Sequence, residues 1–149
     1  MEMVLFIGIQ GSGKSQFYRD HFYSTHVRIN MDMLRTRHRE KLLFNACLEG
    51  QTKFVVDNTN ITREQRAQYI VPARAAKFQV IGYYFSSVVA DALKRNAARS
   101  GDSRVPDVAI FGTAARLELP RRDEGFDQLH FVRISDNNQF IVEDWKDEV

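Results

Sequence analysis

A glycine-rich segment that joins an apolar run to an amphipathic one constrains the fold of this chain more than any other feature. Residues 3–8 form a short hydrophobic run, which predicts a buried strand, and residues 14–22 have the pattern of a helix. Between them the chain reads Gly-Ile-Gln-Gly-Ser-Gly-Lys-Ser at 8–15. A strand that turns through glycines directly into a helix is typical of α/β proteins, in which helices cover a parallel sheet.

The same alternation continues through the rest of the chain. Further strands are expected at 27–30, 53–57, 79–85 and 128–134, and a short additional one at 139–142. Helices are expected at 32–48, 62–76, 89–99 and 106–117, with a flexible loop at 100–103. This spacing predicts right-handed crossovers and an α/β fold with helices on both faces of a parallel sheet. Ligands of such folds bind at the carboxyl ends of the strands, where Gly8, Asn30 and Asp57 are expected to meet.

The composition fits one folded domain of 149 residues. Hydrophobic residues make up 44% of the chain and charged residues 27%, which excludes collagen-like, low-complexity and mainly disordered proteins. No apolar run approaches the roughly 18 residues of a membrane span, and the acidic start of the chain is unlike a signal peptide. The lone Cys47 fits a reducing compartment. We therefore expect a single cytoplasmic domain over residues 1–149 with no membrane partner.

The segment at 8–15 matches the P-loop pattern of Gly, four residues, Gly-Lys and Ser or Thr. Its glycines let backbone N–H groups turn inward around phosphate oxygens, and the following helix adds the positive end of its dipole. In this pattern the lysine reaches the β- and γ-phosphates and the serine hydroxyl is a ligand of Mg²⁺. The alternative is an ordinary glycine-rich turn, which does not require this place between a strand and a helix. The predicted nucleotide-binding residues are Gly11, Ser12, Gly13, Lys14, Ser15 and Gln16, with Ser15 also a metal ligand.

Two aspartates follow predicted strands at the edge where ligands bind. Asp57 ends an apolar strand, which is the position of a carboxylate that fixes Mg²⁺ directly or through water. Asp32 lies just past the second strand, where a carboxylate can orient an attacking hydroxyl and take its proton. The alternative for Asp32 is a helix N-cap. The alternative for the polar residues after Asp57, which include Asn58 and Asn60, is an ordinary turn.

Basic residues are concentrated in two segments, although the formal net charge is only +2. One segment spans 28–41 and the other 94–104, and solvated helix faces are the simplest interpretation of both. Arg95 and Arg99 lie four residues apart, on one face of their predicted helix and beside the loop at 100–103. With a P-loop in the same chain, we interpret this segment as a mobile lid whose guanidinium groups neutralise charge on a transferring phosphoryl group.

Taken together, these motifs resemble the 5′-hydroxyl polynucleotide kinase module of phage and mammalian end-healing enzymes. The resemblance runs from about residue 3 to 134. The P-loop is shared with many kinases, whereas its combination with the other motifs in this order is far more specific. The matching pieces are the P-loop at 8–15, Asn30-Met31-Asp32, Asp57-Asn58-Thr59-Asn60, Arg66, residues 94–99, residues 105–106 and residues 119–126.

The resemblance implies a P-loop kinase fold with a five-stranded parallel sheet and a helical lid. It implies that Asp32 is the general base toward a nucleic-acid 5′-hydroxyl and that Arg99 contacts the donor phosphates from the lid. It adds Arg35 as a contact to the acceptor's phosphate, and Asn58 and Asn60 complete the predicted substrate-binding set. Family members often carry a phosphatase or ligase domain as well, and this chain is expected to be the kinase module alone.

The expected function is Mg²⁺-dependent transfer of the ATP γ-phosphate to the 5′-hydroxyl of DNA or RNA. Lys14, Arg95 and Arg99 bind or neutralise the donor phosphates, Ser15 and Asp57 hold the metal, and Asp32 activates the acceptor. Two alternatives stay open. One is a kinase of a small-molecule hydroxyl on a nucleoside, sugar or antibiotic, whose reaction would depend weakly on salt because it makes few phosphate contacts. The other is a non-catalytic nucleotide-binding switch.

Overall fold

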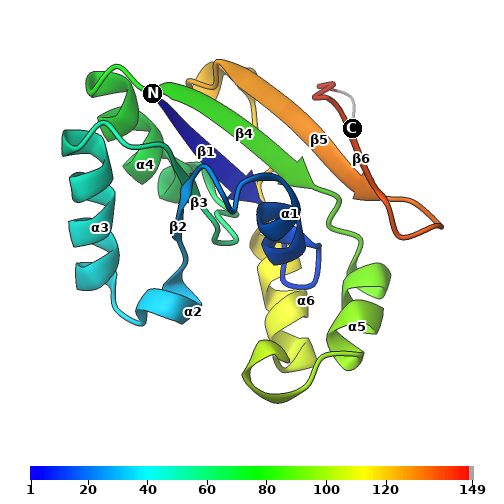
Figure 1. Cartoon of the computed structure of the whole chain (residues 1–149). Helices are drawn as coiled ribbons and strands as arrows, with labels where there is room; N and C mark the ends of the chain where they lie inside the picture. Colours follow the sequence, from blue (N-terminus) through cyan, green and yellow to red (C-terminus); the bar gives the residue numbers. More distant parts are fainter. Residues whose placement is uncertain (148–149) are drawn as a thin grey trace.

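Six strands form one sheet in the order β2-β3-β1-β4-β5-β6 in the computed structural model, which describes residues 1–147 (Figure 1). The first five strands pair in parallel, and β6 runs antiparallel to β5. The expected five-stranded parallel sheet is therefore confirmed, and the short additional strand extends one edge of it. The strands are β1 (Glu2–Ile7), β2 (Val27–Ile29), β3 (Phe54–Val56), β4 (Gln79–Phe85), β5 (Gln128–Ile134) and β6 (Phe140–Asp144).

Helices alternate with the parallel strands and cover both faces of the sheet. In Figure 1, α5 and α6 project together beyond the carboxyl ends of the strands. Among residues 1–147, no helix has both the length and the apolar character that a membrane crossing needs. The helices are α1 (Lys14–His21), α2 (Met31–Leu34), α3 (Arg37–Glu49), α4 (Arg63–Ala75), α5 (Val89–Ala97) and α6 (Asp107–Arg116), with 3₁₀ turns η1 (Gly101–Ser103) and η2 (Arg122–Glu124).

The central strand β1 is buried on both faces and divides the core in two. Met3 and Leu5 pack into a cluster with residues of α3 and α4 on one side of the sheet. Val4 and Phe6 pack on the other side with α1, where the rings of Phe6 and Phe17 meet edge to face with centroids 5.8 Å apart. A strand covered on both faces is a continuous hydrophobic run in sequence rather than an alternating one. This is why residues 3–8 predict a central strand.

The single helix expected at 32–48 is wrong, because the structure divides this stretch into α2 and α3. Arg35 between them has a φ of 75°, in the left-handed region that a continuous α-helix does not contain. Thr36 then caps α3, since its side-chain oxygen accepts a hydrogen bond from the backbone N–H of Arg39. The break leaves α2 as a separate short turn at the carboxyl end of β2 (Figure 1).

The helix expected at 89–99 ends before Arg99, which lies in the turn after α5 and not on one helical face with Arg95. The fully buried Asn96 fixes the path of the chain after this turn. Its Nδ2 donates a hydrogen bond of 2.6 Å to the carbonyl oxygen of Val105, and its Oδ1 accepts one of 3.0 Å from the Val105 N–H. This pair of bonds joins α5 to the segment that enters α6, so the two helices form one hairpin.

Two glycines offer a matched test of the packing of this fold. A Cβ at Gly82 in β4 would lie 2.6 Å from the Phe126 ring and 2.8 Å from the Leu129 side chain, whereas one at Gly112 in α6 would meet nothing within 4 Å. We expect Gly82→Ala to lower the free energy of unfolding by about 1–3 kcal/mol through overpacking. Gly112→Ala should raise it by about 0.5–1 kcal/mol, because alanine favours a helix. Urea denaturation measures both, and an undiminished stability of Gly82→Ala would contradict the packing.

Candidate active site

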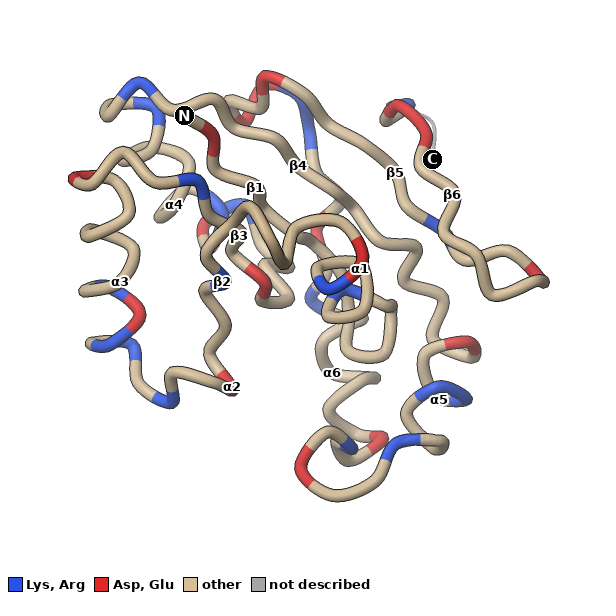
Figure 2. The backbone as a smooth tube through the Cα atoms, in the orientation of Figure 1, with Lys and Arg blue, Asp and Glu red and all other residues tan. Residues whose placement is uncertain are grey.

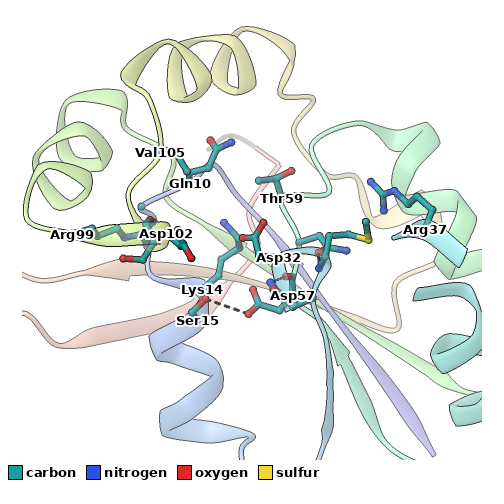
Figure 3. A pocket seen from close by; sticks show the side chains of 15 residues that line it. Gln10, Lys14, Ser15, Asp32, Arg37, Asp57, Thr59, Arg99, Asp102 and Val105 are labelled. Atoms are coloured by element: carbon teal, nitrogen blue, oxygen red, sulfur yellow. Dashed lines mark hydrogen bonds between the residues drawn. The ribbon is translucent and has the colours of Figure 1, made fainter. Parts of the chain in front are cut away.

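A cavity of about 290 Å³, here called the central cavity, lies at the carboxyl ends of the parallel strands (Figure 3). The P-loop, α2, the segment after β3 and the α5–α6 hairpin all contribute to its walls. Figure 3 shows Lys14, Ser15, Asp32 and Asp57 near its centre, with Arg99 on one side and Arg37 on the other. The residues predicted from the sequence that line it are Gly11, Lys14, Ser15, Asp32, Asp57, Asn58 and Arg99.

Two glycines give the P-loop its shape. Gly11 and Gly13 have φ angles of 77° and 101°, left-handed conformations that glycine adopts without steric cost. A Cβ on Gly11 would also lie 2.8 Å from the carbonyl oxygen of Ala92, where α5 contacts the loop. Because Gly13 is the N-cap of α1, the loop leads directly into the positive end of a helix. This is the backbone geometry that binds phosphate groups.

The ammonium group of Lys14 is buried and folded against its own loop. Its Nζ donates hydrogen bonds of 2.9 Å to two backbone carbonyl oxygens of the loop. Burial is the main cause that lowers the pKa of Lys14 to about 8. The negative charge of Asp57 opposes this change, the positive charge of Arg99 adds to it, and the negative charge of Asp32 opposes it more weakly. An anion that enters the cavity would restore the preference of Lys14 for its charged form.

The carboxylate of Asp57 is the centre of a polar cluster, here called the Asp57 cluster, which also contains Arg28 and Ser15. Asp57 is only 1% exposed, and Arg28 of β2 donates to its Oδ2 from Nε at 2.9 Å and approaches the same oxygen through Nη2 at 2.8 Å. Arg28 Nη2 also donates to Ser15 Oγ at 3.0 Å, and Ser15 Oγ donates to Asp57 Oδ2 at 3.5 Å. The cluster therefore joins the ends of two strands to the start of α1.

The oxygens of Ser15 and Asp57 fit a magnesium ion that arrives with a nucleotide. Mg²⁺ is commonly held by one or two protein oxygens together with water and substrate phosphates, rather than by a cage made only of protein. Within residues 1–147, no group of three or more His, Cys, Asp or Glu side chains could hold a metal unaided. Ser15 and Asp57 would therefore hold the ion jointly with phosphate oxygens, while Arg28 contacts the same two side chains.

Asp32 extends from α2 into the central cavity (Figure 3). The interpretation of this residue as a helix N-cap is wrong, because Asn30 caps α2 through an Oδ1 that accepts from the N–H of Met33 at 3.0 Å. The amide of Asn30 also donates to the backbone oxygen of Asp57 at 2.6 Å. This second bond ties α2 to the end of β3, so Asp32 is placed relative to the Asp57 cluster.

A buried polar network supports α2 from behind. Asn58 accepts a hydrogen bond of 3.0 Å from the first backbone N–H of α2 and donates one of 2.9 Å to Glu40. Glu40, which is buried, also accepts from the hydroxyl of Tyr69 at 2.8 Å and from Arg37 at 3.0 Å. Burial, together with the charge of Glu40, raises the pKa of Tyr69 to about 12, so its hydroxyl remains a donor. The side chain of Asn58 thus orients α2 as well as lining the cavity.

A second hollow, of about 770 Å³ and here called the outer hollow, lies between the P-loop, α5 and the β5–β6 hairpin. Gly11 and Arg99 line both spaces, whereas Gln16 and Arg95 line only the outer hollow. Arg95 donates to the carbonyl oxygen of Gly11 at 3.2 Å, and Arg99 donates to that of Ser103 at 3.2 Å. Arg95 therefore contacts the P-loop directly, whereas Arg99 bonds within its own helical hairpin, and the two do not share a helix face.

Several predicted site residues do not line the central cavity. Arg35 is exposed at the break between α2 and α3, and Arg37 lines the cavity in its place. Asn60 is buried, and its amide donates to the carbonyl oxygen of Phe6 at 2.8 Å, so this side chain braces β1. Ser12 is buried, and Gly13 lines the outer hollow.

Two arginines that the sequence analysis did not single out, Arg28 and Arg37, belong to the site. Both fall in the basic segment 28–41, for which a solvated face was the simplest interpretation and from which only Arg35 was named as a phosphate contact. The alternation of side chains in β2 does carry a signal for Arg28: Ile29 packs into the core beside α3 and α4, so its neighbour must face α1. No comparable local pattern separates Arg37 from the nearby Arg35.

Comparison with known families and proteins gives the chain a family and shows that it has the fold of P-loop kinases. The model of the family described as AAA domain matches residues 35–120, which is more than half of the chain. The bifunctional polynucleotide phosphatase/kinase of Schizosaccharomyces pombe is 26% identical over 135 residues, which cover 88% of this chain and 33% of that protein. The chain thus spans about a third of the length of this curated relative.

Solved structures with the same fold include kinases of other substrates. A gluconokinase from Sinorhizobium meliloti aligns with a TM-score of 0.60 and 16% identity over 87% of this chain and 82% of that one. Kti12 of Chaetomium thermophilum, in complex with ADP-AlF3, aligns with a TM-score of 0.67 and 16% identity over 90% of each chain. At this identity the likeness shows the fold alone. That fold, with its P-loop, implies nucleotide binding.

The lowered pKa of Lys14 makes nucleotide binding proton-linked. At pH 8.5 much of Lys14 is neutral in the free protein, since its pKa is about 8. A bound phosphate favours the ammonium form and raises this pKa, so ADP binding should take up a substantial fraction of one proton. Calorimetry in two buffers of different ionisation enthalpy measures this uptake. It should vanish in Lys14→Met and at pH 6.5; proton release at pH 8.5 would contradict the assignment.

Proposed function

The chain belongs to the AAA domain family, and we propose that it is an ATP-dependent kinase that phosphorylates the 5′-hydroxyl of a DNA or RNA end. The observation that carries the proposal is the meeting of Lys14 and Asp32 in one cavity, with Ser15 and Asp57 at its floor. A phosphate-binding lysine and an exposed carboxylate thereby line one cavity of about 290 Å³, where a phosphoryl group and a hydroxyl would meet. We further propose that residues 1–149 constitute one kinase domain.

On the donor side, the P-loop and the α5–α6 hairpin would hold the nucleotide. Gly11, Lys14 and Arg99 line the central cavity, and Arg99 also faces the outer hollow, where the rest of the nucleotide would extend. Magnesium, when bound between Ser15, Asp57 and the phosphates, would neutralise charge on the β- and γ-phosphate oxygens. Arg95 would support the same phosphates indirectly, through its hydrogen bond to the P-loop.

On the acceptor side, Asp32 would accept the proton of the attacking hydroxyl. The 5′ oxygen forms a bond to the γ-phosphorus while the bond from that phosphorus to the β–γ bridging oxygen breaks. The hydroxyl proton passes to the Asp32 carboxylate, and ADP leaves with the electron pair of the broken bond. Lys14 and Arg99 would stabilise the charge that spreads over the transferring group, because both are cations in the same cavity.

A polynucleotide acceptor is favoured by the charges around the cavity and by one relative. Figure 2 shows basic residues near the start of α3 and on α5, and Arg37 of α3 and Arg99 just after α5 both line the cavity. Arg37 lines the cavity with a side chain that is 69% exposed, so it can reach a phosphate of an incoming strand. The relative from Schizosaccharomyces pombe is named a polynucleotide phosphatase/kinase. The gluconokinase likeness extends only to the fold.

The deciding experiment compares acceptors directly. Transfer of labelled γ-phosphate from ATP is measured with 5′-hydroxyl oligonucleotides of DNA and RNA, free nucleosides and sugars. The proposal expects transfer to oligonucleotides, with KM rising steeply with salt because phosphate contacts release condensed counterions. Efficient, salt-insensitive transfer to a nucleoside or sugar would replace the polynucleotide acceptor. Tight ATP binding without transfer to any acceptor would indicate a nucleotide-binding switch.

Asp32→Asn should separate catalysis from nucleotide binding. The variant keeps the size of the side chain but removes the base, so we expect kcat to fall by about 10²–10⁴-fold while the Kd for ADP changes little. Asp136→Asn, an exposed carboxylate in the turn before β6, is the charge-matched control and should keep full activity. Equal loss of binding and transfer in Asp32→Asn would instead make Asp32 structural.

Arg37 and Arg35 provide a matched pair for the acceptor phosphate. Because Arg37 lines the cavity and Arg35 does not, Arg37→Gln should raise the oligonucleotide KM by about tenfold and reduce the salt slope by about one. Arg35→Gln should change KM by less than about threefold. Steady-state kinetics at several salt concentrations tests both variants. A larger rise in KM for Arg35→Gln than for Arg37→Gln would assign the contact to the acceptor phosphate to Arg35.

A further inference from the structure

Phosphate binding and hydroxyl activation leave the guanidinium of Arg28 without a role at the site. It contacts both side chains that fit the magnesium ion: Nε and Nη2 lie 2.9 and 2.8 Å from Asp57 Oδ2, and Nη2 lies 3.0 Å from Ser15 Oγ. Its carbon atom Cζ lies 5.6 Å from the ring centroid of Tyr18, so an aromatic face supports the cation. These contacts hold Arg28 in one place.

This placement puts the permanent positive charge of Arg28 beside the Asp57 carboxylate. A buried carboxylate is costly unless a cation or hydrogen-bond donors neutralise it, and Arg28 provides both. A divalent ion that binds the same pair of side chains meets a full positive charge within a few ångströms. Coulomb repulsion at that distance is substantial even with the screening typical of protein sites.

We propose that Arg28 acts as a built-in competitor of the divalent cation at Ser15 and Asp57. It keeps the affinity of the protein for the free metal ion low, so the metal binds well only together with a nucleotide, whose phosphates supply the negative charge that offsets Arg28. The site thereby distinguishes a metal–nucleotide complex from the free ion. The proposal rests on the proposed function only in taking Ser15 and Asp57 as metal-holding residues.

The alternative is that Arg28 raises the affinity of the site for the metal ion rather than lowering it. Its hydrogen bond to Ser15 orients the hydroxyl and could assemble the metal site rather than oppose it. Orienting one neutral hydroxyl through one hydrogen bond changes the free energy of metal binding less than placing a full positive charge near a divalent ion does. Competition should therefore outweigh assembly, and the affinity of the nucleotide-free protein for metal distinguishes the two.

The test is Mn²⁺ binding to the whole protein, followed by electron paramagnetic resonance of the free ion. We expect Arg28→Gln to bind Mn²⁺ about tenfold more tightly than the wild type without nucleotide, and less than about threefold more tightly in the presence of saturating ADP. Arg133→Gln is the control, because it removes an equal charge from a partly exposed residue of β5 that pairs with Glu143. It should leave Mn²⁺ affinity within about twofold.

Two further variants keep the proposal falsifiable. Arg28→Met replaces the cation by an apolar chain that can still pack on Tyr18, and it should reproduce the tightening if Arg28→Gln fails to fold. Arg28→Lys keeps the charge and should bind Mn²⁺ as the wild type does. Unchanged or weaker Mn²⁺ binding in the folded neutral variants would overturn the proposal. Absence of kinase activity in the wild type with the expected Mn²⁺ result would overturn the proposed function alone.

Discussion

The buried charge of Asp57 is the constraint on which the rest of the site depends. A carboxylate that is 1% exposed needs partners, and its partners come from β2 and α1. Its backbone is also fixed on both sides, since its N–H donates to Ile29 at 2.8 Å and its oxygen accepts from Asn30 at 2.6 Å. One residue therefore sets the P-loop helix, the end of β3 and the start of α2 relative to one another, and with them the two halves of the cavity.

The two halves are built on different supports. The donor half is a backbone structure: a loop with two left-handed glycines entering α1, braced by α5 through Arg95. The acceptor half depends on side chains. The short helix α2 is held by the Asn30 cap and by Asn58, and Asn58 donates a hydrogen bond to the buried Glu40. A half built from backbone groups, which suits phosphate, and a half that presents a carboxylate suit the proposed transfer from a nucleotide to a hydroxyl.

Features with a strong local signal were predictable from the sequence. The continuous apolar run of β1 and the glycine–lysine pattern of the P-loop each need only their own residues to be recognised, and the structure places them as expected. The five parallel strands follow from the spacing of such runs. The break at Arg35 was missed because the helical pattern of residues 32–48 contains no signal for a non-glycine residue with a φ of 75°. The hydrogen bond of Asn60 to β1 and the place of Arg28 in the site were not predicted, because their partners, Phe6 and Asp57, are distant in sequence.

The most direct measurement is a crystal structure of the protein with a non-hydrolysable ATP analogue, Mg²⁺ and an oligonucleotide that ends in a 5′-hydroxyl. We predict that the terminal oxygen lies about 2.6–3.2 Å from an Asp32 carboxylate oxygen and faces the γ-phosphorus, with Lys14 on the far side of the phosphoryl group. A strand end bound outside the central cavity, or an Asp32 side chain turned away from that oxygen, would contradict it.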